Sequence, residues 1–161
     1  MKKHIYIIPM LLAALIVFAG CRKSLKDFTF YYSMESVNNY KLMFSLRSDK
    51  TYKIEEHNYF IDNHSDIQAP VIREGTLTDE EYKEAVKYLS ACDFFRMNDS
   101  YGFDKEVNQD LGDIMYQIAF HTEGKEKYIS IRNSDDNRFP SSFIELLRYI
   151  SHFLKEHPLR Q

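Results

Sequence analysis

The chain is poor in the residues on which several classes of function depend. Its 161 residues include only 5 glycines, 4 prolines and 2 cysteines, and tryptophan is absent. So few glycines leave little material for a phosphate-binding loop, and neither a Gly-x-Gly-x-x-Gly nor a P-loop pattern occurs. The Gly-x-Ser-x-Gly turn of many serine hydrolases is also absent. These absences argue against nucleotide-binding enzymes and against this class of hydrolase.

A large excess of charge of one sign is lacking as well. The chain has 21 Lys and Arg against 24 Asp and Glu, for a net charge of -3. Domains that bind nucleic acid usually carry a basic excess, because they neutralise phosphates. We therefore expect no nucleic-acid partner. The proportions of apolar residues (44%) and charged residues (28%) are typical of a folded globular domain.

One apolar run is present, at the N-terminus. Lys2, Lys3 and His4 precede an uncharged segment, residues 5–19. A positive end followed by a short apolar segment is the layout of a secretory signal. As a helix this segment would measure about 22 Å, short of the roughly 30 Å hydrocarbon core of a bilayer, so we do not expect a permanent span. We predict that residues 1–20 are a signal peptide.

The apolar run ends in Phe18-Ala19-Gly20-Cys21, which resembles the lipobox of bacterial lipoproteins. The resemblance implies that signal peptidase II cuts before Cys21 and that Cys21 carries acyl chains such as palmitate. Each buried CH₂ adds about 0.8 kcal/mol of membrane affinity, so two or three chains anchor a domain firmly. The alternatives are an ordinary signal peptide with a coincidental cysteine and an uncleaved N-terminal helix.

The lipobox resemblance also implies a location. The chain would belong to the cell envelope, with the outer membrane favoured and the domain in the periplasm or at the cell surface. Residues 21–27 would form a lipidated tether. Cys92 would then be the only thiol left, so no intramolecular disulfide could form. Because Cys92 follows a predicted amphipathic helix, we expect it to be buried and unreactive.

Alternating apolar residues predict β-strands in both halves of the chain. Ser48-Asp49-Lys50 and Glu123-Gly124-Lys125 supply the turns of two hairpins. Residues 58–70 are polar and are expected to form a loop. The predicted strands are 28–34, 40–46, 52–54, 71–77, 114–120 and 128–132.

Two segments have the spacing of amphipathic helices. Thr78 and Glu81 form a capping-box pattern, and the apolar residues that follow predict a helix to about Ala91. Ser142 and Glu145 suggest a second capping box, before a C-terminal helix that ends ahead of Pro158. The order β-ββ-β-α-ββ-α predicts an α+β fold: a mainly antiparallel sheet of about five or six strands, with two helices packed on one face. We expect residues 28–161 to form a single domain.

The globular part resembles small, functionally uncharacterised envelope-lipoprotein domains of Gram-negative bacteria. They share a lipobox, an aromatic hairpin, a Gly-x-Leu-Thr-x-Glu-Glu step into a helix, a Phe-rich exit and a Tyr/Asp loop. A Cys-x-x-Cys-Pro segment found in some of these domains is missing here. The resemblance implies no activity. The matching residues are Gly75, Leu77, Thr78, Glu80, Glu81, Phe94, Phe95, Tyr101 and Asp104.

The sequence contains one acidic loop that could bind a hard cation, residues 98–113. Calcium needs several carboxylate oxygens, but the EF-hand spacing is absent, and a solvated connection is the favoured interpretation. His152 and His157 are five residues apart and would diverge by about 140° on a helix, which does not suit zinc. Neighbouring carboxylates such as Glu55 and Glu56 would point to opposite faces of a strand. We expect no metal, no cofactor and no catalytic residue.

These observations lead to two hypotheses of function. The first is a non-catalytic, lipid-anchored envelope protein that binds another, unknown envelope protein. The alternative is an envelope ligand-binding module for glycan or calcium, using the loops at 58–70 and 98–113. In either case the membrane is contacted through the lipid on Cys21. The many Tyr and Phe residues suit a half-buried sheet and would also suit a recognition surface.

Overall fold

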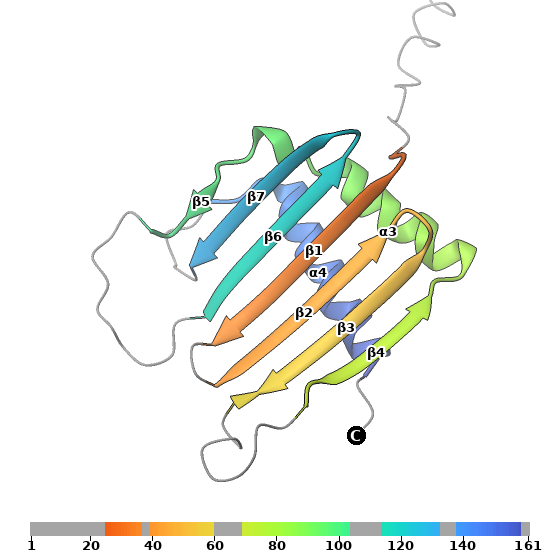
Figure 1. Cartoon of the computed structure of the whole chain (residues 1–161). Helices are drawn as coiled ribbons and strands as arrows, with labels where there is room; N and C mark the ends of the chain where they lie inside the picture. Colours follow the sequence, from red (N-terminus) through yellow and green to blue (C-terminus); the bar gives the residue numbers. More distant parts are fainter. Residues whose placement is uncertain (1–24, 37–38, 60–68, 104–113, 133–137, 159–161) are drawn as a thin grey trace, which may run out of the picture.

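β1 (Phe28–Ser36) lies near the middle of a seven-stranded sheet (Figure 1). The computed structural model describes residues 25–36, 39–59, 69–103, 114–132 and 138–158. The strand order is β4-β3-β2-β1-β6-β7-β5, and all neighbours are antiparallel except β5 and β7. The other strands are β2 (Tyr40–Arg47), β3 (Thr51–Asn58), β4 (Val71–Thr76), β5 (Ser100–Tyr101), β6 (Ile114–Thr122) and β7 (Lys125–Arg132).

Side-chain alternation decides which face of each strand is buried. In β1 the even-numbered residues Phe28, Phe30 and Tyr32 are buried, whereas Tyr31 between them is exposed. The register continues this pattern across the sheet, because Phe30 pairs with Leu46 on one side and with Phe120 on the other. The large apolar side chains therefore lie on one face.

The residues of the two predicted hairpin turns have the hydrogen bonds or the positive φ angles that tight turns require. The backbone N–H and hydroxyl of Thr51 both donate to Asp49 Oδ1, at 2.9 and 2.5 Å, and Lys50 adopts a positive φ of 71°. Between β6 and β7, Glu123 and Gly124 both have positive φ, at 48° and 73°. Two consecutive positive φ values are typical of a type I′ turn, whose twist matches that of the flanking strands.

Two α-helices pack on the same face of the sheet, α3 (Asp79–Ala91) and α4 (Ser141–Glu156) (Figure 1). The predicted α+β fold is thus confirmed, although the sheet has seven strands rather than five or six. The extra strand is β5, which lies in the segment predicted as an acidic loop. Within the described ranges, neither helix is long and apolar enough to cross a bilayer.

The N-terminus of α3 is the predicted capping box. Glu81 N donates to Thr78 Oγ1 at 3.3 Å, and Glu81 Oε2 accepts from Thr78 N at 2.7 Å. The second predicted capping box is wrong. Helix α4 begins earlier, after Pro140, so Ser142 lies inside its first turn and Glu145 pairs instead with Arg148, at 2.5 Å.

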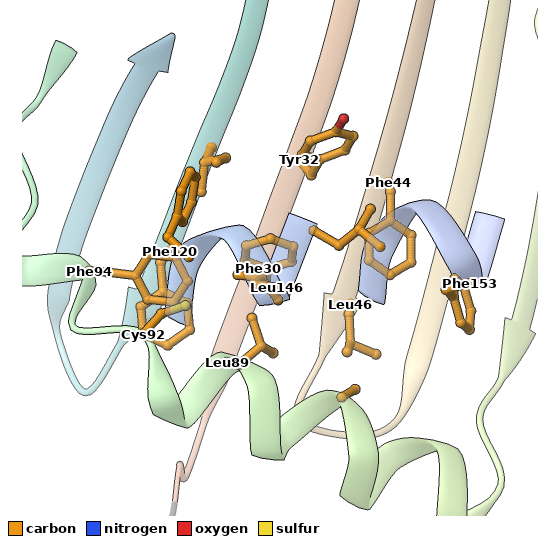
Figure 2. Packing of buried hydrophobic residues seen from close by; sticks show 14 of the residues in the cluster. Phe30, Tyr32, Phe44, Leu46, Leu89, Cys92, Phe94, Phe120, Leu146 and Phe153 are labelled. Atoms are coloured by element: carbon orange, nitrogen blue, oxygen red, sulfur yellow. The ribbon is translucent and has the colours of Figure 1, made fainter. Parts of the chain in front are cut away.

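A single apolar cluster fills the space between the sheet and the two helices (Figure 2). Phe94, in the short 3₁₀ helix η1 (Phe94–Arg96), stacks on Phe120 with ring centroids 4.6 Å apart. At the other end, Phe153 of α4 lies 5.2 Å from Phe44 of β2. Phe95, the neighbour of Phe94 in η1, is 43% exposed.

Candidate functional site

One face of the sheet has no helix packed on it. Both helices lie behind the strands in Figure 1, and no helix of the described residues crosses the front. The outward-pointing half of each strand forms this surface, which we call the open face. Its residues are mostly polar, and many are only partly exposed. Within the described part of the chain, the open face is therefore a broad surface that no helix covers.

A hollow of about 600 Å³ lies on the open face, and we call it the central hollow. Small side chains make its floor: Ser33, Ser45, Ala119 and Ser130. Tyr31 of β1 pairs with both Ser45 and Ala119, and Gln117 of β6 pairs with both Ser33 and Ser130. Because neighbouring strands are about 4.8 Å apart, a group of small residues leaves room that longer neighbours enclose.

Two exposed tyrosines line the central hollow. Tyr31 is 43% exposed and Tyr128 is 57% exposed, which is unusual for rings of this size on a sheet. The imidazole of His121 contacts both, with ring centroids 5.8 Å from Tyr31 and 5.5 Å from Tyr128. The Tyr128 hydroxyl donates to Glu126 Oε2 at 3.1 Å, and this bond raises the pKa of Tyr128. The contacts with His121 and Glu126 therefore restrain the two rings.

Three cations also line the hollow: Lys41 and Arg47, near opposite ends of β2, and Lys53 of β3. Lys53 Nζ lies 2.9 Å from Glu55 Oε2, and Lys41 Nζ lies 3.4 Å from Glu35 Oε2. Arg47 forms no ion pair with any residue that the structure describes. Its guanidinium is thus the cation of the central hollow that is most available to a ligand.

Glu55 is the one carboxylate among the described residues that line the central hollow. The hydrogen bond from Lys53 lowers its pKa, although desolvation opposes the change, and the bond to His57 at 2.8 Å lowers it further. The same contact with Glu55 raises the pKa of Lys53. Both groups are therefore charged at neutral pH and hold each other in place.

The site residues expected from sequence lie largely elsewhere. Cys21 is outside the described residues, as are most of the loop 58–70 and residues 104–113. In the acidic loop, the Asp99 carboxylate forms an ion pair with Lys127. Tyr101 is half-buried, with its ring 5.0 Å from Phe139. No group of three metal-ligating side chains occurs among the residues that are described.

The described histidines are scattered over the fold. His57 lies on the open face beside Glu55, and His121 lies between the two exposed tyrosines. His152 pairs with Glu156 at 3.1 Å on the surface of α4. At the end of that helix, His157 stacks on Phe153 with centroids 4.1 Å apart. His64 lies outside the described residues.

Cys92 is buried, as expected, at the end of α3. Its thiol donates to the Ser142 carbonyl oxygen at 3.3 Å, which ties the end of α3 to the start of α4. Desolvation raises the pKa of this thiol to about 11. Cys92 is therefore almost entirely in the thiol form at neutral pH.

The central hollow was missed by the sequence analysis. One signal was available: serine or alanine stands at outward positions of strands 28–36, 40–47, 114–122 and 125–132, where long polar side chains are usual on a solvated face. The adjacency of strands from the two halves of the chain was needed to join these positions into one site. Neither protein-family models nor curated proteins gave a match to this chain.

Proposed function

We propose that this chain is a lipid-anchored, non-catalytic binding protein of the cell envelope, and that the central hollow is its ligand-binding site. The observation that carries the proposal is the hollow itself. Its volume of about 600 Å³ falls within the roughly 300 to 1,000 Å³ of small-molecule sites. Exposed rings, cations and small polar groups converge there, as in sites that fix the orientation of a ligand.

The way the floor is built favours binding without rearrangement. Ser33 and Ala119 belong to β1 and β6, which pair along nine residues, and β1 also pairs with β2. Hydrogen bonding on both sides restrains these backbones, so little conformational entropy is lost when a ligand binds. This supports a preformed site.

The proposed anchor rests on the lipobox resemblance at Cys21. It places the protein at a membrane, with the outer membrane favoured and the domain facing the periplasm or the cell exterior. Its test is cell fractionation of a Cys21→Ser variant, which we expect to lose membrane association. Cys92→Ser is the matched control and should remain with the membrane. Membrane association of Cys21→Ser equal to that of the control would reject the anchor.

The ligand site is tested by nuclear magnetic resonance with a set of small polar and aromatic fragments. The protein is extracted from membranes in detergent, and backbone amide shifts are followed. We expect fragment-induced shifts to concentrate at Ser33, Ser45 and Ala119. An Ala119→Leu variant, which fills the floor, should lose them, whereas Ala91→Leu on the exposed end of α3 should keep them. Shifts spread over the whole surface would contradict the proposal.

The sheet edge supports a second candidate, binding of an unidentified envelope protein. β4 is an edge strand of six residues, and its Val71 and Ile72 are 36% and 49% exposed. Such an edge presents unpaired backbone groups and apolar side chains to an added strand. A pull-down with the acylated protein tests it. Ile72→Lys should abolish capture of a stoichiometric partner, whereas Ala119→Leu should not; capture unaffected by Ile72→Lys would exclude this edge.

A further inference from the structure

The central hollow is lined by chemically different groups. Exposed tyrosines line it on β1 and β7, and cations line it on β2 and β3. The floor carries hydroxyl groups and an amide, from Ser33, Ser45, Ser130 and Gln117. A ligand that matches all three would have a ring face, a negative charge and several hydroxyl groups. An acidic sugar has this combination.

The charge around the hollow favours an anion, once every neighbour is counted. Lys41, Arg47 and Lys53 line it, with Glu55 as the only carboxylate in the part of the lining that the structure describes. Glu35 partly neutralises Lys41, Glu55 and the nearby Glu74 partly neutralise Lys53, and His57 adds positive charge only when protonated. Glu126, behind Tyr128, is engaged by the tyrosine hydroxyl. Arg47 forms no ion pair with a described residue, but the nearby Asp49 carboxylate acts on it electrostatically and partly offsets its charge. The guanidinium of Arg47 remains as the anion-binding group.

Arg47 and Tyr31 are close enough to act on one ligand. Arg47 pairs with Thr29 of β1, and Tyr31 is the next outward residue along that strand. Such diagonal neighbours lie about 7 to 8 Å apart at their backbones, within reach of long side chains. An arginine binds a carboxylate through two parallel hydrogen bonds, and it keeps its charge at any physiological pH.

We propose that the ligand of the central hollow is an acidic sugar, a uronic acid or a glycan containing one. The carboxylate binds Arg47, one ring face lies against Tyr31 or Tyr128, and the sugar hydroxyls exchange hydrogen bonds with the floor. This inference rests on the proposed ligand site. An aromatic acid would leave the floor hydroxyls unused, and an acidic peptide would offer the cations a charge without a ring that carries hydroxyls.

The test is calorimetric titration of the membrane-extracted protein with glucuronic and galacturonic acids, beside glucose and galactose. We expect at least one acidic sugar to bind tenfold or more tightly than its neutral counterpart. Arg47→Gln should remove that preference and leave the weak affinity for neutral sugar unchanged. Tyr31→Ala should weaken the binding of both sugars. Arg148→Gln on α4, an exposed arginine remote from the hollow, is the matched control and should change neither.

Four outcomes would overturn the inference. Equal affinity for the acidic and neutral sugars, or a preference that survives Arg47→Gln, would remove the role of charge. Binding of tetraglutamate with the same Arg47 dependence, and no binding of sugar, would assign the hollow to an acidic peptide while leaving the ligand site intact. Sugar binding that Ala119→Leu does not affect would place the sugar elsewhere. The proposed ligand site fails separately, when fragments produce no localised shifts at the floor.

Discussion

Gly75 of β4 has no room for a side chain. The ring of Tyr52, its cross-strand partner, lies directly over it, and a Cβ added to Gly75 would come within 2.7 Å of the tyrosine hydroxyl oxygen. Tyr52 is buried and packs edge-on against Phe153, at 5.4 Å between centroids, so the ring is not free to move away. The absence of a side chain at Gly75 therefore makes room for the ring of Tyr52.

We expect Gly75→Ala to lower the free energy of unfolding by about 1 to 3 kcal/mol, the usual cost of overpacking. Chemical denaturation measures it. The control is the same substitution in a Tyr52→Leu background, where the obstructing ring is gone and the added methyl group should cost much less. An equal cost in both backgrounds would show that the contact with Tyr52 is not the cause.

Cys92 should be a slow thiol in the folded protein. Because burial raises its pKa to about 11, roughly one molecule in a thousand carries the thiolate at pH 8. In a Cys21→Ser chain, where Cys92 is the only thiol, we expect iodoacetamide to label the native protein far more slowly than the protein in denaturant. Equal rates in the two states would mean that the thiol is accessible.

At the scale of elements, α3 is stabilised at its N-terminus by Thr78 and Glu81. We expect Thr78→Ala to cost about 1 kcal/mol of stability, since it leaves an amide of the first turn without its acceptor. Denaturant unfolding measures the loss. Thr76→Ala, at an exposed position two residues earlier, is the control and should have a smaller effect.

The same cap makes stability depend on pH. The hydrogen bonds from Thr78 lower the pKa of Glu81 below the ordinary carboxyl value. Its contribution is therefore fully present above the unfolded-state pKa of about 4.5 and is lost as the pH falls through the folded-state value. We expect Glu81→Gln to destabilise the protein more at pH 6 than at pH 3. A difference from wild type that does not change between these pH values would contradict this linkage.

Local patterns predicted most of the elements but not all of them. Alternation identified the six longer strands, and the Thr78–Glu81 spacing identified the start of α3, because these signals depend on neighbours in sequence. β5 has only two residues and exists because it pairs with β7, with Ser130 N donating to Asp99 O at 2.9 Å. No local pattern in the sequence predicts such a pairing.

The central hollow could not be predicted for the same reason. Its floor combines residues of β1 and β2 with residues of β6 and β7, and these pairs of strands are far apart in the chain. The step that joins them is the pairing of β1 with β6, which the sequence does not specify. The sequence analysis placed the candidate ligand site in loops instead, since outward strand positions resemble an ordinary solvated surface.

At the scale of the whole molecule, the strand order sets where the sheet is most stable. β1 and its neighbours are hydrogen-bonded on both sides, whereas β4 has one neighbour and β5 is two residues long. We expect hydrogen exchange to be slowest in β1 and fastest in β4 and β5. Mass spectrometry of peptic fragments measures the order. Exchange in β1 as fast as in β4 would show that the sheet opens as one unit.

The central place of β1 also has a consequence for biosynthesis. β1 is the first of the described strands to emerge from a ribosome, yet one of its two partners, β6, ends only at Thr122. The sheet cannot close until most of the polypeptide has followed. A nascent chain with this topology stays unfolded for longer than one whose early strands complete a hairpin sheet by themselves, which suits the export that we propose for this protein.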